Sequence, residues 1–190
     1  MFSKIPYYTV DIIVKILTLN LYVIKRLITP YTGIGKVLDL GCGVGSLAPL
    51  FKRKNYLGID IDKKSIEFAR KKNLRYKFQV ADVTDFQFND KFDLILIVGV
   101  LHHLNNGDVR KTLEGVSNCL KKDGKLIVIE AIPPIFKWNL PGQFLRANDN
   151  GKFIRLTEEY KSLIEIKFYI KICKSALGGF FDYAFVVGTN

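Results

Sequence analysis

The sequence predicts an α/β fold with a doubly wound, mostly parallel sheet and helices on both faces. Two observations lead to this prediction. From Lys36 onward, short apolar runs alternate with helical patterns, which is the order expected of a parallel sheet covered on both sides. The first apolar run ends in three glycines, at positions 41, 43 and 45, where a buried strand gives way to the next element.

The individual elements follow in chain order. Strands are expected at 36–40, 55–59, 75–80, 92–98 and 124–131, and helices at 46–53, 63–72 and 107–121. A further helix is expected to start at Thr157, because two acidic residues follow in its first turn, where the helix dipole favours them. Two β-rich segments, 164–173 and 180–187, then complete the sheet.

The glycine turn after the first strand is the strongest functional signal. Glycine lets the backbone turn sharply and lets a ligand approach it closely. The spacing is Gly-x-Gly-x-Gly, with Ser46 where the GxGxxG dinucleotide fingerprint has its third glycine, so a nicotinamide cofactor is the less favoured alternative. No Lys or Arg lies between Asp39 and Leu50, and no GxxxxGK[ST] string occurs, which argues against a phosphate-cradling loop.

Aspartates stand at or near the ends of three successive predicted strands. They are Asp39, Asp60 and Asp82. Asp60 follows the first glycine by about 20 residues, the position from which a carboxylate accepts hydrogen bonds from ribose hydroxyls. Each aspartate alone could be a turn or helix cap. Together they indicate a site for an adenosine-type ligand.

Four motifs, in order between residues 34 and 131, resemble those of the class I S-adenosylmethionine-dependent methyltransferases. Residues 37–45 (VLDLGCGVG) resemble the family's first motif, 57–62 (LGIDID) its ribose-binding turn, and 80–83 (VADV) its adenine-contacting segment. Residues 92–104 are similar to its fourth strand and the following loop. The resemblance implies a Rossmann-like fold with an antiparallel C-terminal strand, S-adenosylmethionine as cofactor, and methyltransferase activity.

The resemblance also implies roles for individual residues at the cofactor. Asp60 would hold the ribose hydroxyls, Asp82 the adenine amino group, and the backbone of the glycine turn the methionine portion, which Asp39 would orient. Cys42 lies in the turn as a small buried residue, and we assign it no chemistry. The expected cofactor-binding residues are Asp39, Gly41, Cys42, Gly43, Gly45, Asp60, Ile61, Asp82, Val83 and Val98.

The chain has two histidines, His102 and His103, in the loop after the fourth strand. In related folds this loop faces the methyl group of the cofactor. Alignment of nucleophile and methyl can supply on the order of 7 to 11 kcal/mol of catalysis, so a base is helpful and not obligatory. For a hydroxyl acceptor, histidine is the natural base near pH 7. We name His103 and His102 as candidate catalytic residues. The alternative is that these histidines only cap or brace the following helix.

The segment 132–156 is a long connection rich in proline, and connections of that length are usually functional or disordered. Its aromatic residues could form an apolar substrate wall, and its cations could meet an acidic group. Packing of the loop onto the fold is the alternative. The aromatic residues are Phe136, Trp138, Phe144 and Phe153, and the cations are Arg146, Lys152 and Arg155. Of these, Trp138, Arg146 and Arg155 are our expected substrate-binding residues.

We expect a single methyltransferase domain over residues 1–190. It would comprise a helical cap (1–33), the cofactor-binding core (34–131), a substrate loop or lid (132–156), and a C-terminal helix with antiparallel strands (157–190). The apolar run at 10–28 is interrupted by charges and is too short to cross a membrane. It does not have the pattern of a signal peptide either. Helices packed over the sheet are expected there, with an interfacial membrane helix as the alternative.

Composition is that of an ordinary globular chain, with 190 residues, 48% hydrophobic and 25% charged. The three cysteines, Cys42, Cys119 and Cys173, are widely separated and odd in number, so we expect no disulfide framework and no metal site. A reducing cytoplasm is the expected location.

The acceptor is expected to be a small molecule methylated on oxygen, carbon or an amine, with acidic and lipid-linked compounds included. Residues 98–101 lack the Asn/Asp-Pro-Pro-Tyr/Phe motif used on planar nitrogens, and no Pro-Cys pair is present for pyrimidine-carbon methylation. The net charge of +11 keeps an RNA methyltransferase as an alternative and would also suit peripheral contact with an acidic membrane. A non-catalytic cofactor-binding subunit is the third hypothesis.

Overall fold

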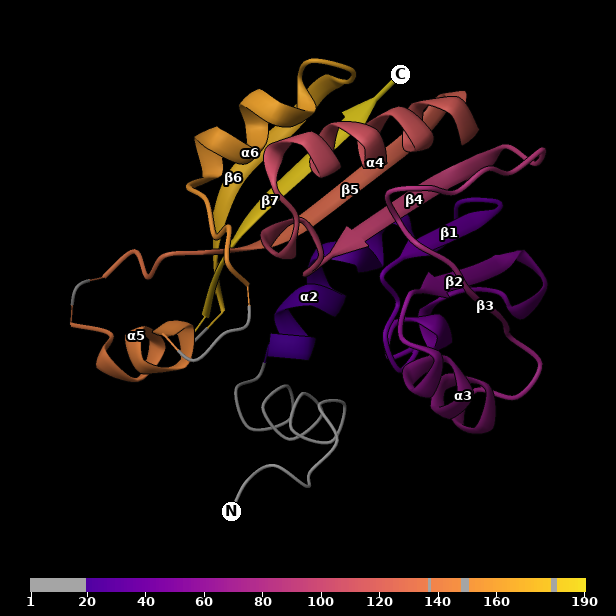
Figure 1. Cartoon of the computed structure of the whole chain (residues 1–190), viewed down its shortest axis with the longest axis horizontal. Helices are drawn as coiled ribbons and strands as arrows, with labels where there is room; N and C mark the ends of the chain where they lie inside the picture. Colours follow the sequence, from indigo (N-terminus) through magenta and orange to yellow (C-terminus); the bar gives the residue numbers. More distant parts are fainter. Residues whose placement is uncertain (1–19, 137, 148–150, 179–180) are drawn as a thin grey trace.

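The computed structural model describes residues 20–136, 138–147, 151–178 and 181–190. In this part of the chain, seven strands form one sheet in the order β3-β2-β1-β4-β5-β7-β6 (Figure 1). Strands β1 to β5 pair in parallel, and β7 pairs antiparallel with both β5 and β6. The strands are β1 Val37–Leu40, β2 Tyr56–Asp60, β3 Lys77–Val80, β4 Phe92–Val98, β5 Leu120–Ile132, β6 Tyr169–Gly178 and β7 Phe181–Thr189.

Helices cover both faces of this sheet (Figure 1). The α-helices are α2 Asn20–Ile28, α3 Lys63–Lys72, α4 Asn106–Cys119, α5 Leu140–Ala147 and α6 Thr157–Ile164. Four 3₁₀ turns are also described: η1 Thr29–Tyr31, η2 Ala48–Leu50, η3 Arg53–Asn55 and η4 Leu101–His103. The predicted fold, a Rossmann-like sheet with antiparallel C-terminal strands, is confirmed.

The apolar core lies in two layers because successive strand residues point to opposite faces of the sheet. On one face, Ile95 of β4 packs in a cluster with Leu113 of α4 and residues of α6. On the other face, its neighbour Leu96 packs in a cluster with Ile28 of α2 and Ile66 of α3. All five side chains are almost completely buried, and each such burial stabilises the fold by about 1.5–3 kcal/mol.

The helix predicted at 46–53 is wrong. The structure has only the turns η2 and η3 in this region. Pro49 lies in η2 and has no N–H to donate to the carbonyl four residues back, so a continuing α-helix would lose a hydrogen bond there. The chain then reaches β2 within a few residues, which leaves no length for another helical turn.

Two further boundaries differ from the prediction. Residues 164–168 were predicted as part of a strand, but they complete helix α6 and a turn before β6 begins at Tyr169. Helix α5 forms inside segment 132–156, where only a loop was expected. The predicted helix start at Thr157 is confirmed, and its acidic first turn includes Glu159, which accepts a hydrogen bond from the backbone N–H of Leu156.

Within the expected cap, 1–33, the structure describes α2 and η1, and residues 1–19 lie outside the described part. Ile24 and Ile28 of α2 are buried against the sheet. Over the described ranges, no helix combines the length and the apolar character that a membrane crossing requires.

The carboxyl ends of β1, β2, β4 and β5 meet at one edge of the sheet, which we call the carboxyl edge. Helix α2 lies close to the end of β4, and the chain runs from the end of β5 into α5 (Figure 1). Ligands of open α/β sheets bind outside this edge. The fold thus brings the predicted glycine turn, aspartates and histidines to the same side of the molecule.

Candidate active site

The glycine turn connects β1 to η2 and is bent into conformations that favour glycine. Gly41, Gly43 and Gly45 have φ values of +69°, +51° and +70°. A Cβ on Gly41 would lie 2.3 Å from Cγ2 of Val100, so the turn packs tightly on the loop after β4. A Cβ on Gly43 would meet nothing within 4 Å. The turn is therefore fixed from behind, and Gly43 leaves an open space that a ligand could fill.

Asp60, at the end of β2, ties this turn to the next loop. Its Oδ2 accepts a hydrogen bond of 2.8 Å from the N–H of Gly43, and its Oδ1 accepts one of 2.9 Å from the N–H of Asp62. The exposed side chain of Ile61 follows directly. The carboxylate keeps lone pairs that can accept hydrogen bonds from ribose hydroxyls. The apolar side chain next to it offers a surface for a flat base.

Asp39 lies beneath the turn and is 1% exposed. The hydroxyl of Tyr56 donates a hydrogen bond of 2.5 Å to its Oδ2. Burial, followed by the charge of Asp39, raises the pKa of Tyr56 well above 10.0, so the phenol keeps its proton for this bond. Sequence reasoning did not identify Tyr56 as a partner of Asp39. Tyr56 is the first residue of β2, whereas Asp39 lies near the end of β1.

The remaining cofactor candidates lie along the same edge. Oδ1 of Asp82 accepts hydrogen bonds of 2.8 Å from both the N–H and the hydroxyl of Thr84, and Val83 is buried between them. Val98 is half-buried at the end of β4. Burial, followed by the charges of Asp39 and Asp60, raises the pKa of the half-buried Cys42 thiol, so it is not a nucleophilic thiolate near neutral pH.

A hollow lies between the glycine turn and α2. It is lined by Asp39, Gly41, Cys42, Gly43, Val44, Ser46, Leu47 and Val98, together with Leu21 and Ile24 of α2. Its polar groups are the Asp39 carboxylate, the Ser46 hydroxyl, the Cys42 thiol and backbone atoms, and no Lys or Arg of the described residues lines it. This donor set suits a ligand that carries cationic groups and no phosphate, as S-adenosylmethionine does. Among the described residues, no group of three metal-ligating side chains gathers at one point.

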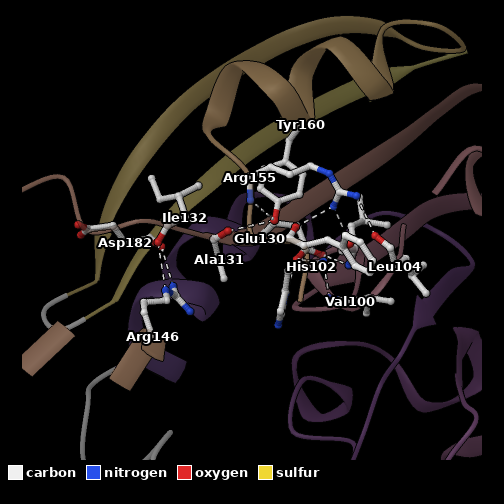
Figure 2. A network of polar contacts seen from close by, with 12 residues as sticks. Val100, His102, Leu104, Glu130, Ala131, Ile132, Arg146, Arg155, Tyr160 and Asp182 are labelled. Carbon is white, nitrogen blue, oxygen red and sulfur yellow. Dashed lines mark hydrogen bonds and ion pairs between the residues drawn. The ribbon is translucent and has the colours of Figure 1, made fainter. Parts of the chain in front are cut away.

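Glu130, near the end of β5, holds the loop after β4 (Figure 2). It is fully buried, and its Oε1 accepts hydrogen bonds of 2.8 and 2.7 Å from the N–H groups of Val100 and Leu101. Its Oε2 lies 2.7 Å from Nδ1 of His102. Because an ionised carboxylate only accepts, the Nδ1 atom carries the proton of this bond. Glu130 was not among the sequence-predicted site residues.

The two candidate histidines differ in their surroundings. His102 is buried against Glu130, and a Cβ on Gly151 would lie 2.2 Å from Cδ2 of its ring. His103 is exposed, and its ring centre lies 4.1 Å from that of His102. His102 is therefore enclosed between the sheet and the end of segment 132–156, whereas His103 stands at the surface of the same loop.

Arg155 was expected to bind substrate, but in the structure its side chain contacts groups of the protein itself. The side chain is 8% exposed, and its five N–H groups are all used inside the protein (Figure 2). Nη1 donates to the carbonyls of Leu101 and Phe153 at 2.9 Å, and Nη2 donates to the carbonyl of Leu104 at 2.8 Å. Nε and Nη2 share Oδ1 of Asn106 at 3.1 and 2.8 Å. Arg155 fixes the loop after β4 and has no donor left for an acidic substrate.

Arg146 and Trp138, the other two substrate candidates, lie apart from this network. Arg146 of α5 donates hydrogen bonds of 3.1 Å to the carbonyls of Ile132 and Asp182, and its guanidinium stands 4.6 Å from the ring centre of Phe181 (Figure 2). It joins α5 to the ends of β5 and β7. Trp138 is 77% exposed and is not brought next to Arg146 or Arg155 by any described contact. The placement of Phe144 in this wall lies outside the described side chains.

Comparison with known proteins agrees with this geometry. A family model described as "Methyltransferase domain" matches residues 37–124. A demethylmenaquinone methyltransferase of Thermotoga maritima is 36% identical over 104 residues, which are 52% of this chain and 44% of that protein. A ubiquinone biosynthesis O-methyltransferase of Pelagibacter ubique is 36% identical over 99 residues, 49% of this chain and 40% of that protein. The chain thus spans less than half the length of these relatives.

Solved structures extend the likeness to the whole fold. A TehB-like SAM-dependent methyltransferase from Corynebacterium glutamicum superposes with a TM-score of 0.71 at 20% identity, over 97% of this chain and 96% of that one. The family match covers the glycine turn, the aspartates at the strand ends and the loop after β4. Residues 37–124 are therefore similar to a methyltransferase domain, and the chain has the fold of the solved SAM-dependent methyltransferase that it superposes on.

Proposed function

We propose that this chain transfers the methyl group of S-adenosylmethionine to an oxygen, carbon or amine of a small molecule. The observation that carries the proposal is the open space at Gly43 beside the Asp60 carboxylate, in a hollow that no described cation lines. The relatives named for menaquinone and ubiquinone methylation support a small-molecule acceptor. Aromatic, quinol-like acceptors are accordingly the first class to test.

The proposed cofactor contacts follow from the positions of the side chains. Asp60 would accept hydrogen bonds from the ribose hydroxyls, and Ile61 would face the base. Asp82 would accept a hydrogen bond from the adenine amino group through the carboxylate oxygen that does not cap Thr84. Asp39 and the glycine turn would hold the methionine portion. When bound, S-adenosylmethionine supplies a methyl carbon activated by a sulfonium leaving group.

The chain's own part in the reaction is to align the acceptor and to receive its proton. Glu130 and Arg155 fix the backbone of the loop after β4, so this loop is a rigid wall beside the cofactor hollow. Rigid alignment of reacting atoms is the main source of rate for an in-line displacement. His103 is the exposed imidazole on this wall and is our candidate for the base that takes the proton of a hydroxyl acceptor. His102 would position the loop through Glu130.

Calorimetric titration with S-adenosylmethionine and its demethylated product tests the cofactor site. Asp60→Ala should weaken binding about tenfold or more, since a hydrogen bond to a charged group contributes about 1.5–3 kcal/mol. Asp123→Ala is the matched control, because Asp123 is an exposed carboxylate near the amino-terminal end of β5, at the opposite end of the sheet from the glycine turn. Equal binding by both variants would refute the assigned role of Asp60.

Incubation with labelled cofactor and a panel of phenols, catechols, amines and carboxylic acids tests the transfer itself. With a hydroxyl acceptor, His103→Gln should lower kcat by about 10²–10⁴ and remove the rise of rate with pH near neutrality. Methylation of RNA, with a steep loss of binding at high salt, would favour the RNA alternative. Cofactor binding without methylation of any compound in a metabolite extract would favour the non-catalytic subunit.

A further inference from the structure

Large apolar side chains are exposed on the connection between β5 and α5. Trp138 is 77% exposed and Leu140 67% exposed, and Ile135 and Phe136 also face solvent. The rings of Phe136 and Trp138 stack with their centres 5.0 Å apart, so they form one aromatic pair. We call Ile135, Phe136, Trp138 and Leu140 the apolar platform. A large contiguous patch of exposed apolar side chains marks an interaction site in soluble proteins.

Helix α2 adds an aromatic and basic surface at the same end of the molecule. Its inner side buries Ile24, whereas Tyr22 is exposed and lines a shallow groove with Lys25 and Arg26. Both α2 and α5 lie beyond the carboxyl edge of the sheet (Figure 1). Leu21 and Ile24 of α2 also line the hollow at the glycine turn. Helix α2 therefore borders the candidate active site, and the platform follows β5 at the same edge of the sheet.

The charges of the chain decide what this surface fits. The net charge is +11, so a second copy of the chain would approach against strong like-charge repulsion. An anionic bilayer attracts cations near its surface, and tryptophan and tyrosine are enriched where a protein meets the headgroup region. Trp138 is exposed on the platform, and Tyr22 is exposed in one groove with Lys25 and Arg26. The surface thus offers both the aromatic residues and the cations that an anionic bilayer attracts.

We propose that the apolar platform and the α2 groove dock the carboxyl edge of this protein onto an anionic lipid surface. The platform would enter the headgroup region, and Lys25 and Arg26 would lie against the anionic headgroups. A further step is that the methyl acceptor is drawn from this lipid surface, and this step rests on the proposed function.

The only tryptophan of the chain gives a direct test, because intrinsic emission then reports Trp138 alone. Phosphatidylcholine vesicles containing phosphatidylglycerol should shift the emission to shorter wavelength and pellet the protein. Acyl-brominated phosphatidylcholine in the same vesicles should quench it. Pure phosphatidylcholine should bind much less, and added sodium chloride should weaken the binding. Unchanged emission with anionic vesicles at low salt would overturn the proposal.

Matched variants separate the platform from general stickiness of the chain. Phe136→Ser together with Trp138→Ser should lower the vesicle partition coefficient by about tenfold or more. Tyr169→Ser is the control, because Tyr169 is 74% exposed at the start of β6, away from the carboxyl edge of the sheet. Equal losses in both would refute the role of the platform.

Charge variants separate the α2 groove from the net charge in the same way. Lys25→Glu with Arg26→Glu should reduce binding more than Lys71→Glu with Lys72→Glu, which changes charge equally at the end of α3. Equal losses would show that net charge alone drives binding and would overturn the groove's role. Concentration-dependent dimerisation abolished by the platform variant would instead assign the platform to self-association.

These measurements need neither cofactor nor acceptor, so they stand apart from the proposed function. Vesicle binding without methyl transfer would leave docking intact and refute the catalytic proposal. Methyl transfer to a water-soluble acceptor without vesicle binding would refute docking and leave catalysis intact.

Discussion

Replacement of Arg155 by Met should destabilise the fold by about 3 kcal/mol, because the guanidinium serves several buried acceptors at once. The change removes the donors to the carbonyls of Leu101, Leu104 and Phe153 and to Oδ1 of Asn106. Asn106 is exposed and can bond water instead. A hydrogen bond from a charged donor contributes about 1.5–3 kcal/mol. The carbonyl of Leu101 keeps its hydrogen bond from the N–H of Leu104, so the bonds lost at Leu104 and Phe153, each at the low end of that range, give the figure above.

Urea unfolding followed by circular dichroism measures this free energy. Arg155→Lys keeps the charge and up to three donors and should lose only about 1–2 kcal/mol. Arg110→Met, on the exposed side of α4, is the control and should stay within about 0.5 kcal/mol of the parent. A loss below about 1 kcal/mol for Arg155→Met would refute the view that this side chain holds the loop after β4 in place.

Three further predictions concern buried or capping groups. Glu130→Gln should cost about 1–3 kcal/mol, because the amide NH₂ would face donors, the ring and N–H of His102 among them, and thermal unfolding measures this. The hydroxyl of Ser65 and nearby backbone N–H groups hold the pKa of Asp62 below 3.8, so its stabilising effect is present above about pH 4 and is lost as pH falls through the lowered pKa. Asp62→Ala should therefore cost about 1 kcal/mol at pH 7 in urea unfolding and almost nothing in strong acid; an equal difference at both pH values would contradict this. Burial raises the pKa of the Cys119 thiol to about 11, so iodoacetamide at pH 8 should label it only after unfolding, as mass spectrometry would show.

The parts of the site that sequence could predict depend on short-range spacing. The glycine turn and Asp60 are separated by two 3₁₀ turns and one strand, and the topology of the sheet brings their loops together, as the 2.8 Å bond from Gly43 shows. The core strands were predictable for the same reason, since runs buried on both faces are apolar throughout. The helix expected at 46–53 failed where a single residue, Pro49, outweighed the local apolar pattern.

The parts that sequence could not predict depend on contacts between distant residues. Arg155 and the carbonyl of Leu101 are 54 positions apart, and Glu130 and the N–H of Leu101 are 29 positions apart. In the linear sequence, Arg155 in a polar connection looks like a cation exposed to a substrate, and Glu130 looks like the end of a strand. Only the folded chain shows that each is buried and that both bind main-chain atoms of the same loop.

The loop after β4 contains the single helical turn η4, and its two ends meet opposite charges. The carboxylate of Glu130 accepts from the amides at its beginning, and the guanidinium of Arg155 donates to the carbonyl of Leu101 within the turn and to that of Leu104 just beyond its end. This matches the polarity of the aligned peptide dipoles. Because the loop is held chiefly through its main chain, side chains such as His103 can change without altering its path. One scaffold can thereby present different groups to different acceptors.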